Sequence, residues 1–100
     1  MYGTVARLKA KPGKREELIE FLRTVPGRPN RYIGRCLYQM DNDSDEFFLA
    51  GVFESKEAYF THSHKSETHQ IYLRLLELLV AEPEWHDGHV VFMDLQKGEN

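Results

Sequence analysis

The residues best suited to chemistry lie in one short segment, from Phe53 to His62. Ser55 can cap a helix after an apolar strand, because its hydroxyl accepts hydrogen bonds from the first free N–H groups. Ala58 and His62 are four residues apart, so they share one face of that helix. The small side chain of Ala58 lets the helix lie close to a sheet, and His62 then points into the gap.

An imidazole titrates near neutrality, so His62 can accept the proton of a phenol at pH 7 and is the candidate catalytic residue. The alternative is an end-of-helix residue that caps carbonyl groups or meets solvent. The chain has five histidines, all in its second half, and their spacing matches no metal-binding motif such as H-E-x-x-H. We therefore expect no metal site and no cofactor, although a metal site assembled in space stays open.

Three aromatic side chains are candidates for substrate binding: His69, Tyr72 and Trp85. Tyr72 follows His69 by three residues on a similar helical face, where it either packs in the core or forms a pocket wall. Trp85 lies in a loop predicted for Pro83–Gly88, where it covers a pocket mouth, stacks on a planar ligand or partner chain, or plugs the core. In the same loop Asp87 is assigned to the turn.

The elements that must position these residues follow from hydrophobic periodicity. The pattern predicts four strands, at Tyr2–Ala10, Tyr32–Met40, Glu46–Glu54 and His89–Leu95. It predicts helices from Lys14 to Val25, from Ser55 to about Ser63, and from Ser66, read as a cap, to about Ala81. The order predicts an α+β fold of ferredoxin-like β-α-β-β-α-β type with a four-stranded antiparallel sheet.

The third predicted strand is apolar on both faces. Phe47, Leu49 and Phe53 line one face, while Phe48, Ala50 and Val52 line the other. Helices can cover only one face of the sheet in a chain of 100 residues, so the other face needs a partner. The simplest partner is a second copy, and the pattern predicts a homodimer.

Length and composition exclude several classes of protein. One hundred residues predict a single domain, 1–100, and a net charge of −3 offers no electrostatic footprint for nucleic acid or an anionic membrane. The most apolar segment, Ile71–Val80, is interrupted by charges and too short to span a bilayer. Cys36 is the only cysteine and is expected to be a small buried hydrophobe. With no signal peptide apparent at the N-terminus, we expect a cytoplasmic protein.

The strand, the Ser55 cap and the Ala58-x-x-x-His62 spacing resemble the antibiotic biosynthesis monooxygenase family of dimeric α+β barrel proteins. The resemblance implies oxygenation of a small aromatic substrate, quinol- or anthrone-like, without metal or flavin, in which a deprotonated ring gives an electron to O2 directly. His62 matches the family's recurrent helix histidine, whereas Phe53 stands where many members have tryptophan. The haem-degrading relatives' asparagine, tryptophan and histidine fall on Ala6, His62 and Tyr72, so haem degradation is discounted.

Two other functions compete with a monooxygenase. A non-catalytic dimeric α+β barrel that binds a small apolar ligand fits the sequence equally well. An RNA-binding domain shares the β-α-β-β-α-β order, but that function needs exposed aromatics amid basic residues on the first and third strands. Glu46 and Glu54 bound the third strand and the net charge is negative, so RNA binding is set aside.

Overall fold

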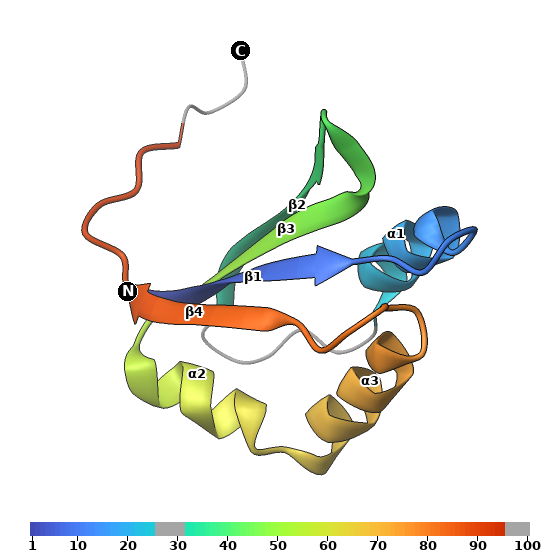
Figure 1. The fold of residues 1–100 in the computed structure, drawn as a ribbon. Coiled ribbons are helices and arrows are strands. Elements are labelled where there is room, and N and C mark those ends of the chain that lie inside the picture. Colours follow the sequence, from blue (N-terminus) through green and yellow to red (C-terminus); the bar gives the residue numbers. More distant parts are fainter. Residues whose placement is uncertain (26–31, 96–100) are drawn as a thin grey trace.

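The fold is a four-stranded antiparallel sheet with three helices, shown in Figure 1. The computed structural model describes residues 1–25 and 32–95. The elements are β1 (Tyr2–Lys9), α1 (Arg15–Thr24), β2 (Tyr32–Met40), β3 (Asp43–Phe53), α2 (Lys56–Ser63), α3 (Ser66–Leu76) and β4 (Glu84–His89). The predicted α+β architecture of ferredoxin-like type is confirmed, with the second helical region split into two helices.

Strand β1 is one of the two inner strands of the sheet, whose order is β2-β3-β1-β4. It pairs with β3 on one side and with β4 on the other, both antiparallel. Residues opposite each other in these ladders point to the same face, so the register decides which side chains meet. One face, here called the inner face, is covered by the helices, and the opposite one is the outer face (Figure 1).

The predicted fourth strand at His89–Leu95 is wrong. The strand is Glu84–His89, so Trp85 and Asp87 lie in β4 and not in a loop. Its pairing runs from Arg7 opposite Glu84 to His89 opposite Tyr2, the first residue of β1. One more backbone bond, from Val90 to the Met1 carbonyl, closes the ladder, and the chain beyond it has no described strand to pair with.

The hydrophobic core fills one end of the inner face. It joins α1 and α3 to β1 and β3 through Ala6, Leu8, Ala10, Leu18, Leu22, Phe47, Leu75, Leu78 and Leu79. In α1, Leu18 and Leu22 are buried at helical spacing, and acidic side chains in the first turn and Arg23 in the last complement the helix dipole. Helix α3 ends at Leu76 rather than near Ala81, and the following residues return the chain to the sheet edge.

The outer face is apolar over its half nearer β2. Six residues form this apolar patch, and the register places them on one side of the sheet: Val5, Cys36, Tyr38, Phe48, Ala50 and Val52. Val5 is 45% exposed and Tyr38 is 55% exposed. The expectation that Cys36 is buried is wrong, because its strand position turns it outward. Ion pairs of Arg7 with Glu46 and Glu84, and of Lys9 with Asp43, occupy the other part.

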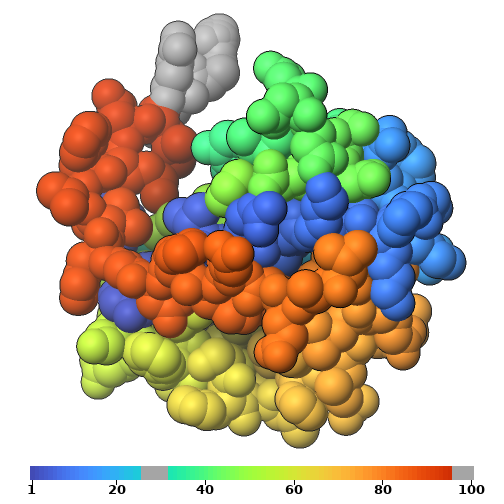
Figure 2. Space-filling model, viewed as in Figure 1, coloured from blue at the N-terminus to red at the C-terminus, as the bar shows by residue number. Residues whose placement is uncertain are grey.

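The segment after β4 stands apart from this body. Figure 2 shows it at the edge of the molecule, separated from β2 and β3 by a hollow. Val91, Phe92 and Leu95 are 93%, 80% and 73% exposed. Large apolar side chains with this exposure are unusual on a protein that works alone.

The cap of α2 provides a test of the local structure. The Ser55 hydroxyl accepts a hydrogen bond of 3.1 Å from the Ala58 N–H, as the sequence predicted. Ser66 is the first residue of α3 and not its cap, since Lys65 holds that position without a side-chain bond. We expect Ser55→Ala to lower the free energy of unfolding in urea by about 1 kcal/mol, and Ser66→Ala by less than about 0.5 kcal/mol. Equal losses would contradict the assigned caps.

Candidate functional site

A cavity of about 580 Å³ lies between the inner face of the sheet and helices α2 and α3. Its volume is in the range of small-molecule sites. Every strand and helix contributes to its lining, which consists of Thr4, Leu22, Arg23, Val25, Tyr32, Arg35, Leu49, Gly51, Phe53, Tyr59, Phe60, His62, Ser63, Thr68, Ile71, Tyr72, Leu75, Trp85 and Asp87. Most of these side chains are apolar or aromatic, so the cavity suits a ring-shaped ligand.

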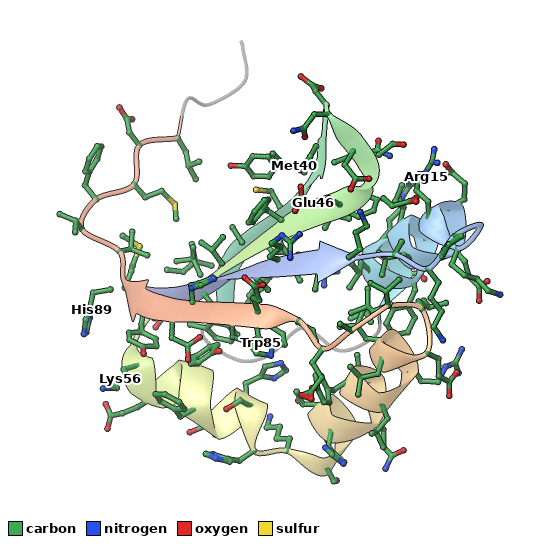
Figure 3. The ribbon with its side chains drawn as sticks, viewed as in Figure 1. Arg15, Met40, Glu46, Lys56, Trp85 and His89 are labelled. Atoms are coloured by element: carbon green, nitrogen blue, oxygen red, sulfur yellow. The ribbon has the colours of Figure 1, made fainter. Side chains whose placement is uncertain are left out.

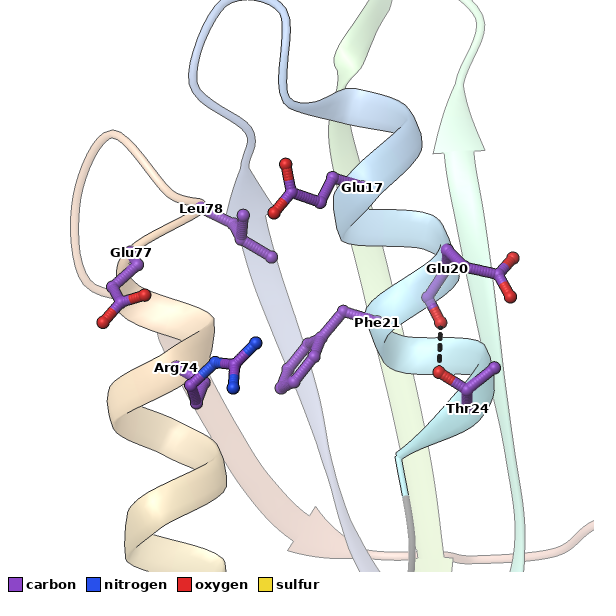
Figure 4. Close-up of a pocket in the computed structure, with 7 residues that line it drawn as sticks. All are labelled: Glu17, Glu20, Phe21, Thr24, Arg74, Glu77 and Leu78. Carbon is purple, nitrogen blue, oxygen red and sulfur yellow. Dashed lines mark hydrogen bonds between the residues drawn. The ribbon is translucent and has the colours of Figure 1, made fainter.

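A second, smaller cavity of about 220 Å³ lies between α1 and α3 (Figure 4). Three carboxylates, from Glu17, Glu20 and Glu77, line it, and the guanidinium of Arg74 lies 6.0 Å from the ring of Phe21. These are the solvated charges of two neighbouring helices. No residue singled out by the sequence lies there, so the larger cavity is the candidate site.

One row of residues in register crosses the floor of the larger cavity. Arg35 of β2 is opposite Gly51 of β3, which is opposite Thr4 of β1, which is opposite Asp87 of β4. All four line the cavity. Gly51 leaves room there, because a Cβ added to it would meet no atom within 4 Å. The row, here called the polar row, thus has a cation at one end and a carboxylate at the other.

At the Asp87 end of the polar row, a hydrogen bond joins a strand residue to a helix residue. The hydroxyl of Tyr59, on α2, donates to Oδ1 of Asp87 at 2.9 Å. Burial, followed by this bond and the charge of Asp87, raises the pKa of Tyr59 to about 12, while the Thr4 hydroxyl opposes the shift. Tyr59 therefore keeps its proton at pH 7. Thr4 Oγ1 is itself buried and makes no hydrogen bond of normal geometry with the described residues.

His62 lies half-buried on α2 and faces the cavity. Its ring is 5.6 Å from that of Phe53, centroid to centroid, at an interplanar angle of 32°. Burial lowers the pKa of His62 from its ordinary value of 6.5, and the charge of Lys65 lowers it further. The imidazole is therefore neutral at pH 7, which is the form that a general base needs.

The contacts of Thr68 favour one tautomer of this imidazole. Its hydroxyl donates to the carbonyl oxygen of His62 at 2.8 Å and lies 3.5 Å from His62 Nδ1. Because the single hydroxyl proton is used by the carbonyl, the oxygen can only accept from Nδ1–H. The lone pair is then on Nε2, the nitrogen left to accept a proton.

The three predicted substrate-binding residues are only partly brought together. Tyr72 and Trp85 line the same cavity as His62, with their rings 6.5 Å apart. Figure 3 shows Trp85 on the side of β4 that faces α2 and α3. Burial, with the Glu82 carboxylate nearby, raises the pKa of Tyr72. His69 is exposed and is not among the lining residues, although its ring is 6.5 Å from that of Tyr72.

Several lining residues were missed by the sequence. Asp87 was assigned to a turn, but it lies in β4 and holds Tyr59. Nothing in the sequence around Thr4 or Arg35 indicates a binding site, because a polar residue on a strand is usually interpreted as facing solvent. Only the strand register, which brings them beside Gly51, could have pointed to them.

The fold and cavity define an α+β small-molecule-binding protein, and comparison with known proteins supplies its family. The sequence profile of antibiotic biosynthesis monooxygenases matches residues 1–74. The chain therefore belongs to the antibiotic biosynthesis monooxygenase family. No significant match was found among proteins with curated functions.

Solved structures agree with this assignment at the level of the fold. A candidate antibiotic biosynthesis monooxygenase from Chloroflexus aurantiacus is 22% identical, with a TM-score of 0.79 over 93% of this chain and 95% of that one. One from Deinococcus radiodurans is 13% identical, with a TM-score of 0.80 over 98% of this chain and 100% of that one. One from Nitrosomonas europaea is 14% identical, with a TM-score of 0.77, covering 92% and 100%.

Within residues 1–25 and 32–95 no three histidine, cysteine or acidic side chains are placed to hold a metal ion. None of the helices in these ranges has the length and apolar character needed to cross a membrane.

Titration of His62 tests the electrostatics of the site. NMR should place the pKa of His62 below the ordinary 6.5. Lys65→Gln should raise this pKa only part of the way back toward 6.5, because burial is the larger cause of the shift. The unfolded chain then binds more protons than the folded one as the pH falls from about 6.5, so stability is lost in that direction. The variant His62→Gln should lose this pH dependence. A pKa at or above 6.5 would contradict the buried, neutral imidazole.

Proposed function

We propose that this protein oxygenates a small aromatic substrate, quinol- or anthrone-like, without a cofactor. The observation that carries the proposal is that His62, Tyr72 and Trp85 line one largely apolar cavity. A neutral imidazole in such a cavity can take the proton of a phenol and leave the electron-rich anion against apolar walls. Membership of the monooxygenase family supports the same reaction.

The reaction balances without an external reductant. For an anthrone, the substrate CH2 group and O2 become a ring carbonyl and water, so the substrate supplies all four electrons. His62 Nε2 accepts the first proton, and the resulting anion gives an electron to O2. One oxygen atom stays on the ring carbon, and the other leaves as water.

The other side chains position the ring. Tyr72 and Trp85 form one wall, and Phe53 backs the imidazole of His62. His69 acts indirectly in this scheme, as a support for the ring of Tyr72 from outside the cavity. Gly51 leaves the space in which the substrate lies.

The proposal predicts a large loss of activity in His62→Ala. General-base assistance is worth about 10²–10⁴-fold in rate, so turnover of an anthrone or a dihydroxynaphthalene should fall at least about 100-fold. The measurement is the rate at which one ¹⁸O atom from ¹⁸O2 enters the product, after subtraction of the rate without protein, because spontaneous oxidation by O2 gives the same labelled product. His64→Ala is the matched control, because that exposed histidine stacks on Phe60 and does not line the cavity.

A His62→Ala variant as active as the parent would remove His62 from the mechanism. A parent protein that binds these rings but incorporates ¹⁸O no faster than the protein-free control would favour the alternative function, a non-catalytic dimeric barrel that binds a small apolar ligand. Both functions need the cavity, and only the first needs a base within it.

We also propose that the protein acts as a homodimer. The unpaired apolar patch on the outer face and the exposed side chains of Val91, Phe92 and Leu95 are the surfaces that a second copy would cover. Burying apolar area stabilises association by about 25 cal/mol per Å². Obligate interfaces commonly bury more than about 2,000 Å², which is the scale of a whole sheet face.

The dimer is expected to dissociate when a charge enters the apolar patch. Sedimentation should give twice the 11.7 kDa chain mass for the parent and the single mass for Tyr38→Glu. Cys36, in the same patch, should react slowly with a maleimide in the parent and rapidly in that variant. Leu73→Glu is the control, since Leu73 is 43% exposed on α3, on the other side of the sheet. A monomeric parent at micromolar concentration would contradict the dimer.

A further inference from the structure

We infer that the cavity selects a phenol that carries an anionic substituent, a carboxylate being the simplest. In this inference, residues of the polar row bind both the phenolic oxygen and the anionic group. The inference rests on the proposed function and narrows its substrate class. It starts from an imbalance of charge, because the chain has a net charge of −3, whereas the described residues that line its cavity include two arginines and one carboxylate.

Arg35 is the residue that would hold the anion. Its Nη2 donates to the carbonyl oxygen of Leu22 at 2.7 Å, which fixes the guanidinium at the end of α1. Within residues 1–25 and 32–95 no carboxylate forms an ion pair with it. A guanidinium has five N–H donors in a planar fork, so one bond to a carbonyl leaves donors for a carboxylate.

Arg23 lies on the same side of the cavity but is less suited to this role. It is 3.8 Å from Glu20 on its own helix, and its side chain is 70% exposed. Arg35 is exposed as well, so what separates the two arginines is that the charge of Arg23 is already paired with Glu20. We therefore assign recognition of the anion to Arg35 and treat Arg23 as the weaker neighbour.

Thr4 would form a hydrogen bond with the phenolic oxygen. Its hydroxyl is buried in the polar row, lines the cavity and makes no hydrogen bond of normal geometry with the described residues. The Tyr59 hydroxyl lies near it without the geometry of a normal hydrogen bond, so this buried group is poorly satisfied, and a ligand oxygen can complete its bonding. Asp87, at the far end, already accepts the Tyr59 proton and repels an anion placed there.

The row therefore orients the ring. Neighbouring strands are about 4.8 Å apart, so the anion end and the Asp87 end are separated by about 14 Å, with the space over Gly51 between them. A bicyclic ring with an anionic and a phenolic substituent spans from Arg35 to Thr4. The reverse placement would bring its anion to Asp87, so one orientation is favoured.

Binding measurements with three simple rings test the inference: 6-hydroxy-2-naphthoate, whose two substituents lie at opposite ends of the bicycle, 2-naphthol and 2-naphthoate. Isothermal titration should give at least about tenfold tighter binding of 6-hydroxy-2-naphthoate than of 2-naphthol, as expected for a charge-assisted bond. Arg35→Gln should abolish that preference and Arg35→Lys should keep most of it. Both variants lose the guanidinium bond to Leu22, so their difference reports the charge and not the fold.

Thr4→Val should remove the preference for 6-hydroxy-2-naphthoate over 2-naphthoate, while Arg23→Gln leaves that preference in place. Gly51→Leu should abolish binding of all three rings, since its side chain enters open space in the cavity. Equal affinity for 6-hydroxy-2-naphthoate and 2-naphthol would overturn the inference and leave the proposed function standing. Binding of none of the rings would overturn both.

Discussion

The double pairing of β1, with β3 on one side and β4 on the other, is the constraint on which the site depends. Antiparallel partners share a face, so the position of Thr4 in β1 decides that Gly51 and Asp87 are its neighbours. A slip of one residue would turn every inner side chain outward and remove the cavity floor. The length of β1 also ends β4 at His89, which leaves the apolar residues after it outside the sheet.

One end of the inner face carries the hydrophobic core, and the other end carries the candidate site. Leu18, Leu22 and Leu75 pack against β1 and β3 at one end and form a continuous core. At the other end α2 lies against the sheet through Ala58, and aromatic rings surround a cavity instead of filling it. A small residue in the helix and a glycine in the strand keep that space open.

The electrostatics of the cavity follow from burial as much as from charge. Burial is the largest cause both of the lowered pKa of His62 and of the raised pKa of Tyr59, so each side chain is neutral at pH 7. The two charges of the polar row, on Arg35 and Asp87, lie at its opposite ends in the sheet. A ligand in this cavity therefore meets neutral, apolar walls and a floor that is positively charged at one end and negatively charged at the other.

Local sequence was enough to predict the first three strands, α1, the Ser55 cap and the position of His62 on α2, because each depends on periodicity or on one neighbouring turn. The family, too, could be identified from that short segment. Tertiary pairing decided the rest. Val91 and Phe92 have strong β-forming side chains, yet Trp85 and Asp87 form the strand, because only they lie opposite β1. The polar row was equally invisible, since its members are far apart in the chain and meet only through strand register.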